Sequence, residues 1–213
     1  MPPITRRATI FALATLAFPA AAMVPASGRL AFTAKRNGDR LGTHALDFNR
    51  QGDALTVTVA VDYLVKLGPI PLFRYALRGS ETWRGDTLMA AQFATDDDGT
   101  KEFMRAGRNG AALEVEGSKS GRYTAPSGAI AATHWNRREL DGPMINPQNG
   151  ELLEFAVTPP ASETIARPAG AITAQRFGLT GPSRLDLWYD DAGVWAALRA
   201  VARDGSIITY ERE

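Results

Sequence analysis

Short turn dipeptides divide this chain into a series of strand-like segments, and they constrain its fold more than any other feature of the sequence. Asn-Gly and Asp-Gly pairs readily take the positive φ angles of tight hairpin turns. Such pairs occur at Asn37-Gly38, Asp98-Gly99, Asn109-Gly110, Asn149-Gly150 and Asp204-Gly205. Apolar and polar residues alternate between the turns, most clearly over residues 55–65. A period of two is typical of a half-buried β-strand.

The same alternation predicts strands along most of the chain. The predicted strands are 29–35, 41–50, 55–65, 72–84, 87–95, 100–106, 111–116, 151–158, 172–180, 184–190, 194–203 and 206–212. No helical segments separate them in the way that parallel βαβ units require. The sequence therefore predicts an all-β fold, built as an antiparallel meander.

Two stretches interrupt this pattern. Residues 117–149 are rich in Gly, Ser, Pro and Asn, and they contain a predicted short helix over 134–140 with Thr133 as its N-cap. Long irregular connections are typical of lids, plugs and binding loops. The second stretch, 67–73, has two prolines and a glycine beside four apolar residues. It fits either a bend between two strands or an apolar lip on an opening.

Residues 1–26 have the features of a secretory signal peptide. Arg6 and Arg7 form a positively charged start, and the segment contains no acidic residue. The apolar run over residues 8–18 has the length of a signal core and is too short to span a bilayer. The sequence therefore predicts export to the periplasm, by either the general or the twin-arginine route.

Small residues at 24–26 predict cleavage before Ser27, and a second possible site follows residues 20–22. The remaining segment, 27–213, has the length of one domain. No second apolar stretch approaches the length of a transmembrane helix. We therefore expect no transmembrane segment once the leader is removed.

Composition excludes several kinds of chemistry. The 213 residues include no cysteine and only two histidines, which argues against thiol nucleophiles, iron–sulfur clusters and multi-histidine metal sites. The formal net charge of +1 lacks the basic surplus of a nucleic-acid-binding protein. We therefore expect no metal, no cofactor and no nucleic-acid partner.

His134 is the one candidate for catalysis. A carboxylate at Glu139 or Asp141 could orient its imidazole, as in the triads of hydrolases. The chain has no Gly-x-Ser-x-Gly motif to supply a serine nucleophile. The simpler interpretation is that His134 and Trp135 anchor the short helix to the end of a barrel. Other carboxylates, including Glu81, lie in strand-like segments that sequence alone does not bring together.

Five stretches of the chain carry a resemblance to a known family. They are AFTAKRNGDRLGTHALDF, VKLGPIPLFRY, GRYTAPSGAIAATHWN, GPMINPQNGELLEF and DLWYDDAGVWAALRAVARDGSIITY. Together they resemble an uncharacterised domain-of-unknown-function family of exported proteobacterial proteins, which is similar to the EipB-like and, more distantly, the LolA- and LolB-like envelope proteins. The resemblance implies a strongly curved antiparallel sheet that forms an open, spiral-like β-barrel around one short helical segment. This chain lacks the cysteine pair of the EipB group, so no redox role follows.

The favoured hypothesis is a non-enzymatic periplasmic protein that binds a lipophilic or envelope-derived ligand in envelope maintenance. Eight or more strands can enclose one small ligand. The residues expected to contact it are Leu67, Ile70, Leu72, Phe73, Trp135, Met144 and Ile145. One alternative is an exported hydrolase that uses His134. The other is a structural module that pairs with an envelope protein through exposed strand edges.

Overall fold

The computed structural model describes residues 23–67 and 69–213, and it confirms the predicted all-β antiparallel meander. One sheet of 14 strands has the order β12-β14-β15-β16-β17-β1-β2-β3-β4-β5-β6-β7-β8, with β13 paired to β14. Every pair of neighbours in it is antiparallel. A second, three-stranded sheet has the order β11-β10-β9.

The strands of the large sheet differ greatly in length, and the longest ones lie in its first half. These are β1 (Arg29–Arg36), β2 (Asp39–Gln51), β3 (Ala54–Leu67), β4 (Ile70–Arg84), β5 (Thr87–Asp97), β6 (Thr100–Asn109), β7 (Ala112–Gly117) and β8 (Gly121–Thr124). The second half consists of β12 (Ala156–Val157), β13 (Ala161–Ile165), β14 (Ile172–Thr180), β15 (Arg184–Asp190), β16 (Trp195–Val201) and β17 (Ile207–Arg212).

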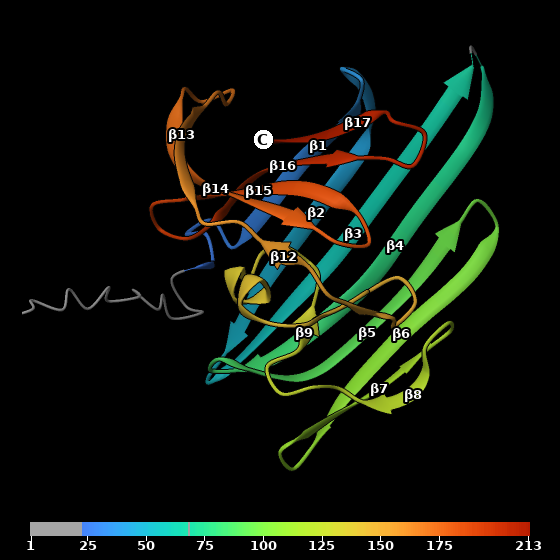
Figure 1. Ribbon diagram of the computed structural model, residues 1–213, viewed down its shortest axis with the longest axis vertical. Helices are drawn as coiled ribbons and strands as arrows, with labels where there is room; N and C mark the ends of the chain where they lie inside the picture. The colour runs from blue at the N-terminus through green and yellow to red at the C-terminus, as the bar shows by residue number, and fades with distance from the viewer. Residues whose placement is uncertain (1–22, 68) are drawn as a thin grey trace, which may run out of the picture.

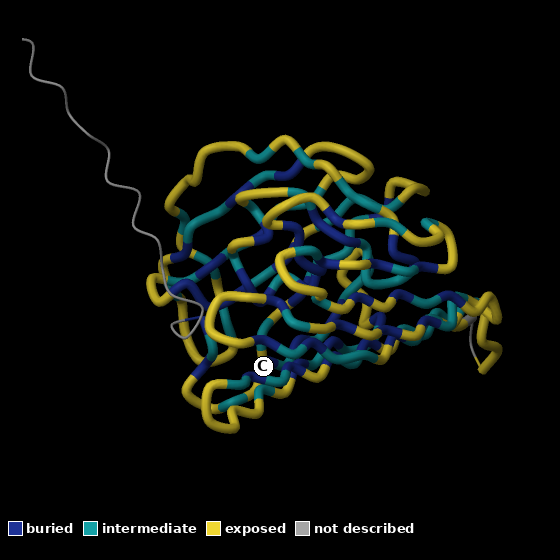
Figure 2. Tube along the Cα trace, turned by 90° about the horizontal axis from the view of Figure 1, so that it is seen from below, coloured by how far each residue is buried: buried dark blue, intermediate teal, exposed yellow. Residues whose placement is uncertain are grey.

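The sheet curls around itself and remains open. Strand β1 pairs with β17, so the first and last described strands lie side by side in the middle of the sheet (Figure 1). The two ends of the sheet, β8 on one side and β12 with β13 on the other, are not hydrogen-bonded to each other. Exposed residues are concentrated at the turns, whereas buried and partly buried residues alternate along the strands (Figure 2).

Gly42 allows one sharp bend in this sheet. A Cβ atom at this position would lie only 1.8 Å from the carbonyl oxygen of Asp62 on β3. The register between β1 and β2 shifts beside it, between Ala34 and Lys35. A glycine beside a bulge lets two backbones approach closely where a barrel turns a corner.

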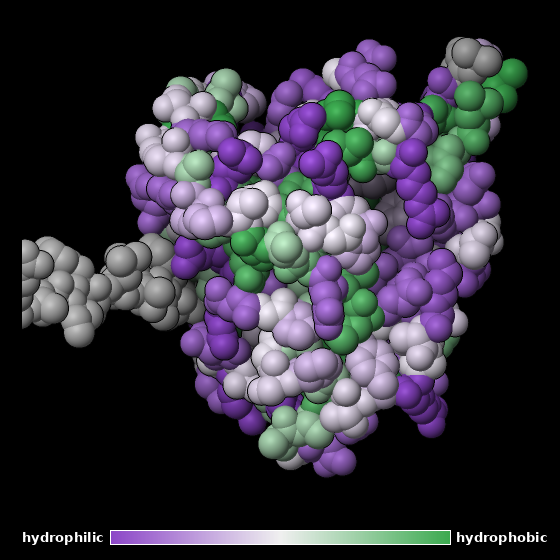
Figure 3. Space-filling model, viewed as in Figure 1, coloured by the Kyte–Doolittle hydropathy of each residue, from purple (hydrophilic) through white to green (hydrophobic). Residues whose placement is uncertain are grey.

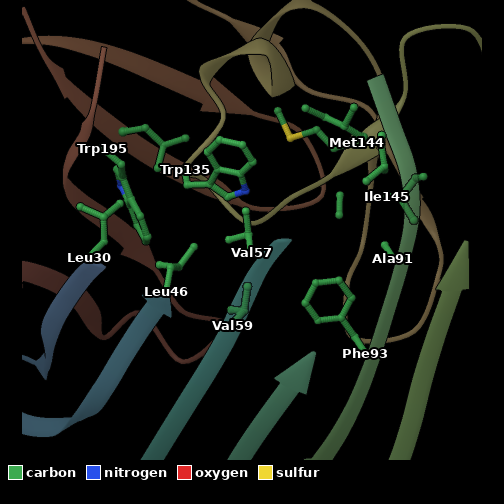
Figure 4. Packing of buried hydrophobic residues seen from close by; sticks show 14 of the residues in the cluster. Leu30, Leu46, Val57, Val59, Ala91, Phe93, Trp135, Met144, Ile145 and Trp195 are labelled. Atoms are coloured by element: carbon green, nitrogen blue, oxygen red, sulfur yellow. The ribbon is translucent and has the colours of Figure 1, made fainter. Parts of the chain in front are cut away.

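Most of the predicted irregular segment lies inside the curve of the sheet, although its first part forms β8 of the sheet itself. Residues 130–153, called the inserted segment here, continue a few residues beyond it. They contain β9 (Ile130–Ala131), β10 (Met144–Ile145) and β11 (Leu152–Leu153), and they fill much of the interior (Figure 1). Trp135, Met144 and Ile145 are at most 1% exposed. Figure 4 shows their side chains among those of the strand residues, with Trp135 facing Val57. The segment therefore completes the hydrophobic core of an otherwise hollow barrel.

The predicted helix over 134–140 is a shorter 3-10 helix, η2 (Arg137–Asp141). The predicted N-cap, Thr133, is wrong, because the side chain of Asn136 accepts a hydrogen bond from the Arg138 amide in that role. The Thr133 hydroxyl instead donates to the Glu81 carboxylate on β4. The local sequence predicted that the Thr133 hydroxyl would cap the helix, but it binds a buried carboxylate on the barrel wall instead.

The predicted signal peptide lies largely outside the described residues, which begin at Met23. Met23 is 1% exposed and belongs to the hydrophobic core, and its sulfur accepts a hydrogen bond from the Arg137 amide at 3.1 Å. Cleavage before Ser27 would remove this side chain, whereas cleavage after residue 22 would retain it. In the described part of the chain, no helix has the length and apolar character needed to cross a membrane.

We expect a chain that begins at Ser27 to be less stable than one that begins at Met23, by about 2 kcal/mol. The reason is that the shorter chain loses a buried methionine side chain and leaves a cavity. Urea denaturation of the two purified chains measures the difference, and Met23→Ala in the longer chain should account for most of it. Equal unfolding midpoints would show that Met23 adds nothing to the core.

Candidate functional site

A partly open cavity of about 250 Å³, called the interior cavity here, lies between the barrel wall and the inserted segment. Most of its lining is apolar, and the strands contribute Val59, Val61, Leu77, Leu179 and Leu185. The inserted segment and the residues just after it contribute Ala132, Met144, Leu153 and Phe155. The polar ring-bearing side chains that line it are His44, Tyr63, Tyr75, His134 and Tyr210. The cavity thus combines an apolar wall with a small set of hydrogen-bonding groups, as ligand sites commonly do.

His44 is the most unusual of these side chains. It projects from β2 and is only 6% exposed, yet neither ring nitrogen has a hydrogen-bond partner among the described residues. The rings of Trp195 and Tyr210 lie at 5.3 and 5.5 Å from its ring, both edge-on. Burial, reinforced by the nearby His134, lowers the pKa of His44 from 6.5 to about 3. The imidazole is therefore neutral, with one donor and one acceptor unused.

Three tyrosines add phenol groups to the same cavity. The hydroxyls of Tyr63 and Tyr210 are hydrogen-bonded to each other, and the rings of Tyr63 and Tyr75 stack at 5.4 Å. Burial is the main cause that raises the pKa of all three phenols, that of Tyr210 to about 12. All three are therefore protonated and uncharged near neutral pH.

The structure pairs His134 with Glu139, one of its two predicted carboxylates. The Nδ1 atom of His134 lies 2.8 Å from Oε1 of Glu139, and the backbone amide of His134 donates to Oε2 at 3.0 Å. His134 has φ at +67°, a left-handed conformation that is uncommon outside glycine, although histidine adopts it more readily than most residues. The Tyr189 hydroxyl donates to its carbonyl oxygen at 2.9 Å. These contacts hold the ring at the cavity wall, with Nδ1 committed to the carboxylate.

The other predicted carboxylate, Asp141, is exposed at the end of η2. It lines a separate surface depression with Gly142 and Pro143. Glu139, in contrast, is 1% exposed. Of the two predicted partners of His134, the buried Glu139 is therefore the one that contacts it.

Glu81 connects the barrel wall to the inserted segment. It is fully buried on β4 and accepts hydrogen bonds from the indole nitrogens of Trp83 and Trp135 at 2.7 and 3.0 Å, and from the Thr133 hydroxyl at 2.5 Å. Burial raises its pKa from 4.5 to about 7, although the three donors act in the opposite direction. Glu81 thus holds both Thr133 and Trp135, the neighbours of His134 in the chain, by hydrogen bonds.

A larger open cavity of about 760 Å³ lies at the mouth of the barrel. It shares two lining residues, Tyr63 and Asn146, with the interior cavity. Six charged side chains line it: Arg36, Lys119, Arg203, Asp97, Glu151 and Asp204. The mouth is therefore polar and balanced in charge, while the interior cavity has no aspartate, glutamate, lysine or arginine in its lining.

The residues predicted to contact a ligand lie in three different places. Met144 lines the interior cavity and Phe73 lines the mouth. Trp135 and Ile145 are fully buried core residues, and the Trp135 ring is edge-on to those of Phe48 and Trp83.

The remaining predicted residues belong to the β3–β4 hairpin. Leu67 ends β3 and pairs with Ile70. Ile70 and Leu72 are 59% and 56% exposed at the tip of the hairpin. Figure 3 shows this tip as a hydrophobic corner on a largely hydrophilic face. The predicted set is therefore not one site.

Sequence reasoning did not predict His44 or the tyrosines as site residues. One signal was available, because His44 has the same strand parity as Leu46 and Phe48, and a residue in that register points inward. In the described part of the chain, no three histidine, cysteine, aspartate or glutamate side chains are grouped so that they could hold a metal ion.

Comparison with solved structures shows the same architecture elsewhere. The chain is similar to a β-barrel-like protein of the domain of unknown function DUF1849 from Brucella abortus, with a TM-score of 0.59 and 10% sequence identity. The likeness covers 87% of this chain and 94% of that chain. At this identity it shows the fold alone, and it confirms the predicted barrel-like form.

No curated protein matches the chain in sequence. A family model does match it, over residues 32–213, which include nearly all of the curved sheet and the whole inserted segment. The chain therefore belongs to the family described as domain of unknown function DUF6134.

Proposed function

We propose that this protein is an exported, non-enzymatic binding protein that holds a lipophilic small molecule inside its barrel and serves the bacterial envelope. The observation that carries the proposal is the interior cavity together with His44. A cavity of about 250 Å³ with a mainly apolar lining favours an apolar ligand. An unpartnered imidazole on its wall is costly unless a bound molecule satisfies it.

The mouth supplies a route to this cavity. Both cavities are lined by Tyr63 and Asn146. A ligand that passes these two side chains moves from a mouth with six charged side chains to a cavity whose lining has no aspartate, glutamate, lysine or arginine. The predicted leader is the basis for placing this function in the periplasm.

A hydrolase remains the second candidate because of one distance, the 2.8 Å between His134 and Glu139. A carboxylate-oriented imidazole is a suitable general base. Ester hydrolysis by the purified protein that is lost in His134→Ala would favour it. Equal rates in the two proteins would leave binding as the function.

The proposal is tested by native mass spectrometry with lipid extraction on protein purified gently from its own periplasm. We expect a discrete bound mass. Ala132→Phe places a ring in the cavity and should lower the bound fraction about fivefold or more. Ala94→Phe makes the same change at an exposed position on β5 and should leave the bound fraction unchanged.

Two results would overturn the proposal. One is a protein free of any bound mass that also shows no thermal shift with a panel of lipids. The other is a bound mass that both phenylalanine variants retain equally, since the ligand would then lie outside the interior cavity.

A further inference from the structure

The interior cavity differs from the mouth in one property that bears on ligand chemistry. Its polar groups are His44, Thr133, His134, Asn146, Ser183 and the three tyrosines, and its lining includes no acidic or basic residue apart from the histidines. The mouth, in contrast, has three basic and three acidic side chains. A charged ligand group could therefore pair with an arginine, lysine, aspartate or glutamate in the mouth, and with none of these in the interior.

Four of the polar groups of the interior, one imidazole and three phenols, remain uncharged near neutral pH. Burial holds the His44 imidazole in its neutral form and the phenols of Tyr63, Tyr75 and Tyr210 in their protonated forms. An ion placed among them would lose its hydration without gaining a partner of opposite charge, which is strongly unfavourable. The carboxyl group of Glu139, behind the cavity wall, is already engaged by the Nδ1 atom and the backbone amide of His134.

The interior nevertheless offers hydrogen bonds that nothing in the described chain uses. His44 has both ring nitrogens free of partners, and each needs either a donor or an acceptor from a ligand. A pure hydrocarbon would leave this deficit in place, whereas a group that both donates and accepts would remove it.

We infer that the interior cavity selects a lipophilic molecule whose buried polar group is uncharged and hydrogen-bonding, such as an alcohol or an amide, over acids and amines of the same chain length. This inference rests on the proposed function and names the ligand class of the same cavity. His44 is its central recognition residue, and the hydroxyls of the Tyr63–Tyr210 pair stand on the same wall.

A panel of ligands with one common chain tests the inference. Decanol, decanamide, decanoate and decylammonium are titrated separately into delipidated protein at neutral pH, and binding is measured by isothermal calorimetry. We expect decanol and decanamide to bind about tenfold or more tightly than either ion. The Ala132→Phe variant should bind the neutral compounds at least about fivefold more weakly, since its ring occupies the cavity.

The outcomes separate the inference from the proposed function. If decanoate or decylammonium binds as tightly as decanol, and Ala132→Phe weakens that binding, the inference is overturned while a lipophile-binding function stands. If no member of the panel binds and the periplasmic protein has no bound mass, both fail. If decanol binds equally to wild type and Ala132→Phe, the inference is overturned because the site lies elsewhere.

Discussion

Replacing Glu81 with alanine is expected to lower the free energy of unfolding by about 3–5 kcal/mol, which is the largest effect we predict for a single substitution. The change removes the common acceptor of Trp83, Trp135 and Thr133, three donors that are at most 3% exposed. Each would be left buried without its partner, and the inserted segment would lose its polar attachment to β4. Chemical denaturation measures the loss directly.

Glu81→Gln is the matched control. Its amide oxygen can accept from both indoles while its nitrogen donates to the Thr133 hydroxyl, so we expect stability within about 1 kcal/mol of wild type at neutral pH. A loss as large as that of the alanine variant would show that the negative charge of Glu81, rather than its hydrogen-bonding capacity, is required.

The pH dependence of stability provides a second readout of Glu81. Its pKa is about 7 in the folded protein, whereas an exposed glutamate carboxyl has a pKa of 4.5. Between these values the folded chain holds a proton that the unfolded chain releases, so stability falls as the pH rises from 4.5 to 7. The contribution is up to about 3 kcal/mol, and Glu81→Gln should remove it. An unchanged slope in the glutamine variant would contradict the raised pKa.

Most of the sheet could be predicted because its information is local. Residues 172–180 and 184–190 were predicted as strands and form β14 and β15 with the same bounds. Each depends on alternation within one segment and on a turn next to it. Strands that follow each other in sequence then pair with each other in space, and the pairing of β1 with β17 is the main long-range step in the meander.

The errors arise where pairing depends on distant parts of the chain. The predicted strand 151–158 is two short strands, β11 and β12, because its first half pairs with β10 inside the barrel and its second half with β14 on the wall. The strands β8, β9, β10 and β13 were not predicted. They are short, and they exist because a neighbouring strand offers free backbone groups.

The site was predictable only where it was local. His134 and Glu139 are five residues apart, so sequence alone suggested their pairing. His44 and Tyr210 meet only because β1 brings β2 and β17 close together. Trp135 was predicted as a ligand contact but is a core residue. An apolar side chain fits a cavity wall or a core equally well, and only its hydrogen bond to the distant Glu81 places it in the core.

Replacing His44 with leucine is expected to change stability and ligand affinity in opposite directions. Leucine removes two buried nitrogens that have no partner, so the ligand-free protein should gain about 1 kcal/mol in free energy of unfolding. The same change should weaken binding of a neutral ligand such as decanol by about 30-fold, because the ligand hydroxyl loses its partner.

The combination of higher stability and weaker binding distinguishes a ligand-binding residue from a purely structural one. If His44 served only the packing of the core, through its edge-on contacts with Trp195 and Tyr210, its replacement would leave the affinity for decanol unchanged. If it serves a ligand, the free protein carries an unfavourable group that only binding offsets, and removing that group relieves the free state. His44→Gln retains a donor and an acceptor at this position and should keep affinity within about threefold of wild type. Calorimetric titration and urea denaturation of the two variants together test both signs, and a leucine variant that is less stable yet binds normally would assign His44 to the core alone.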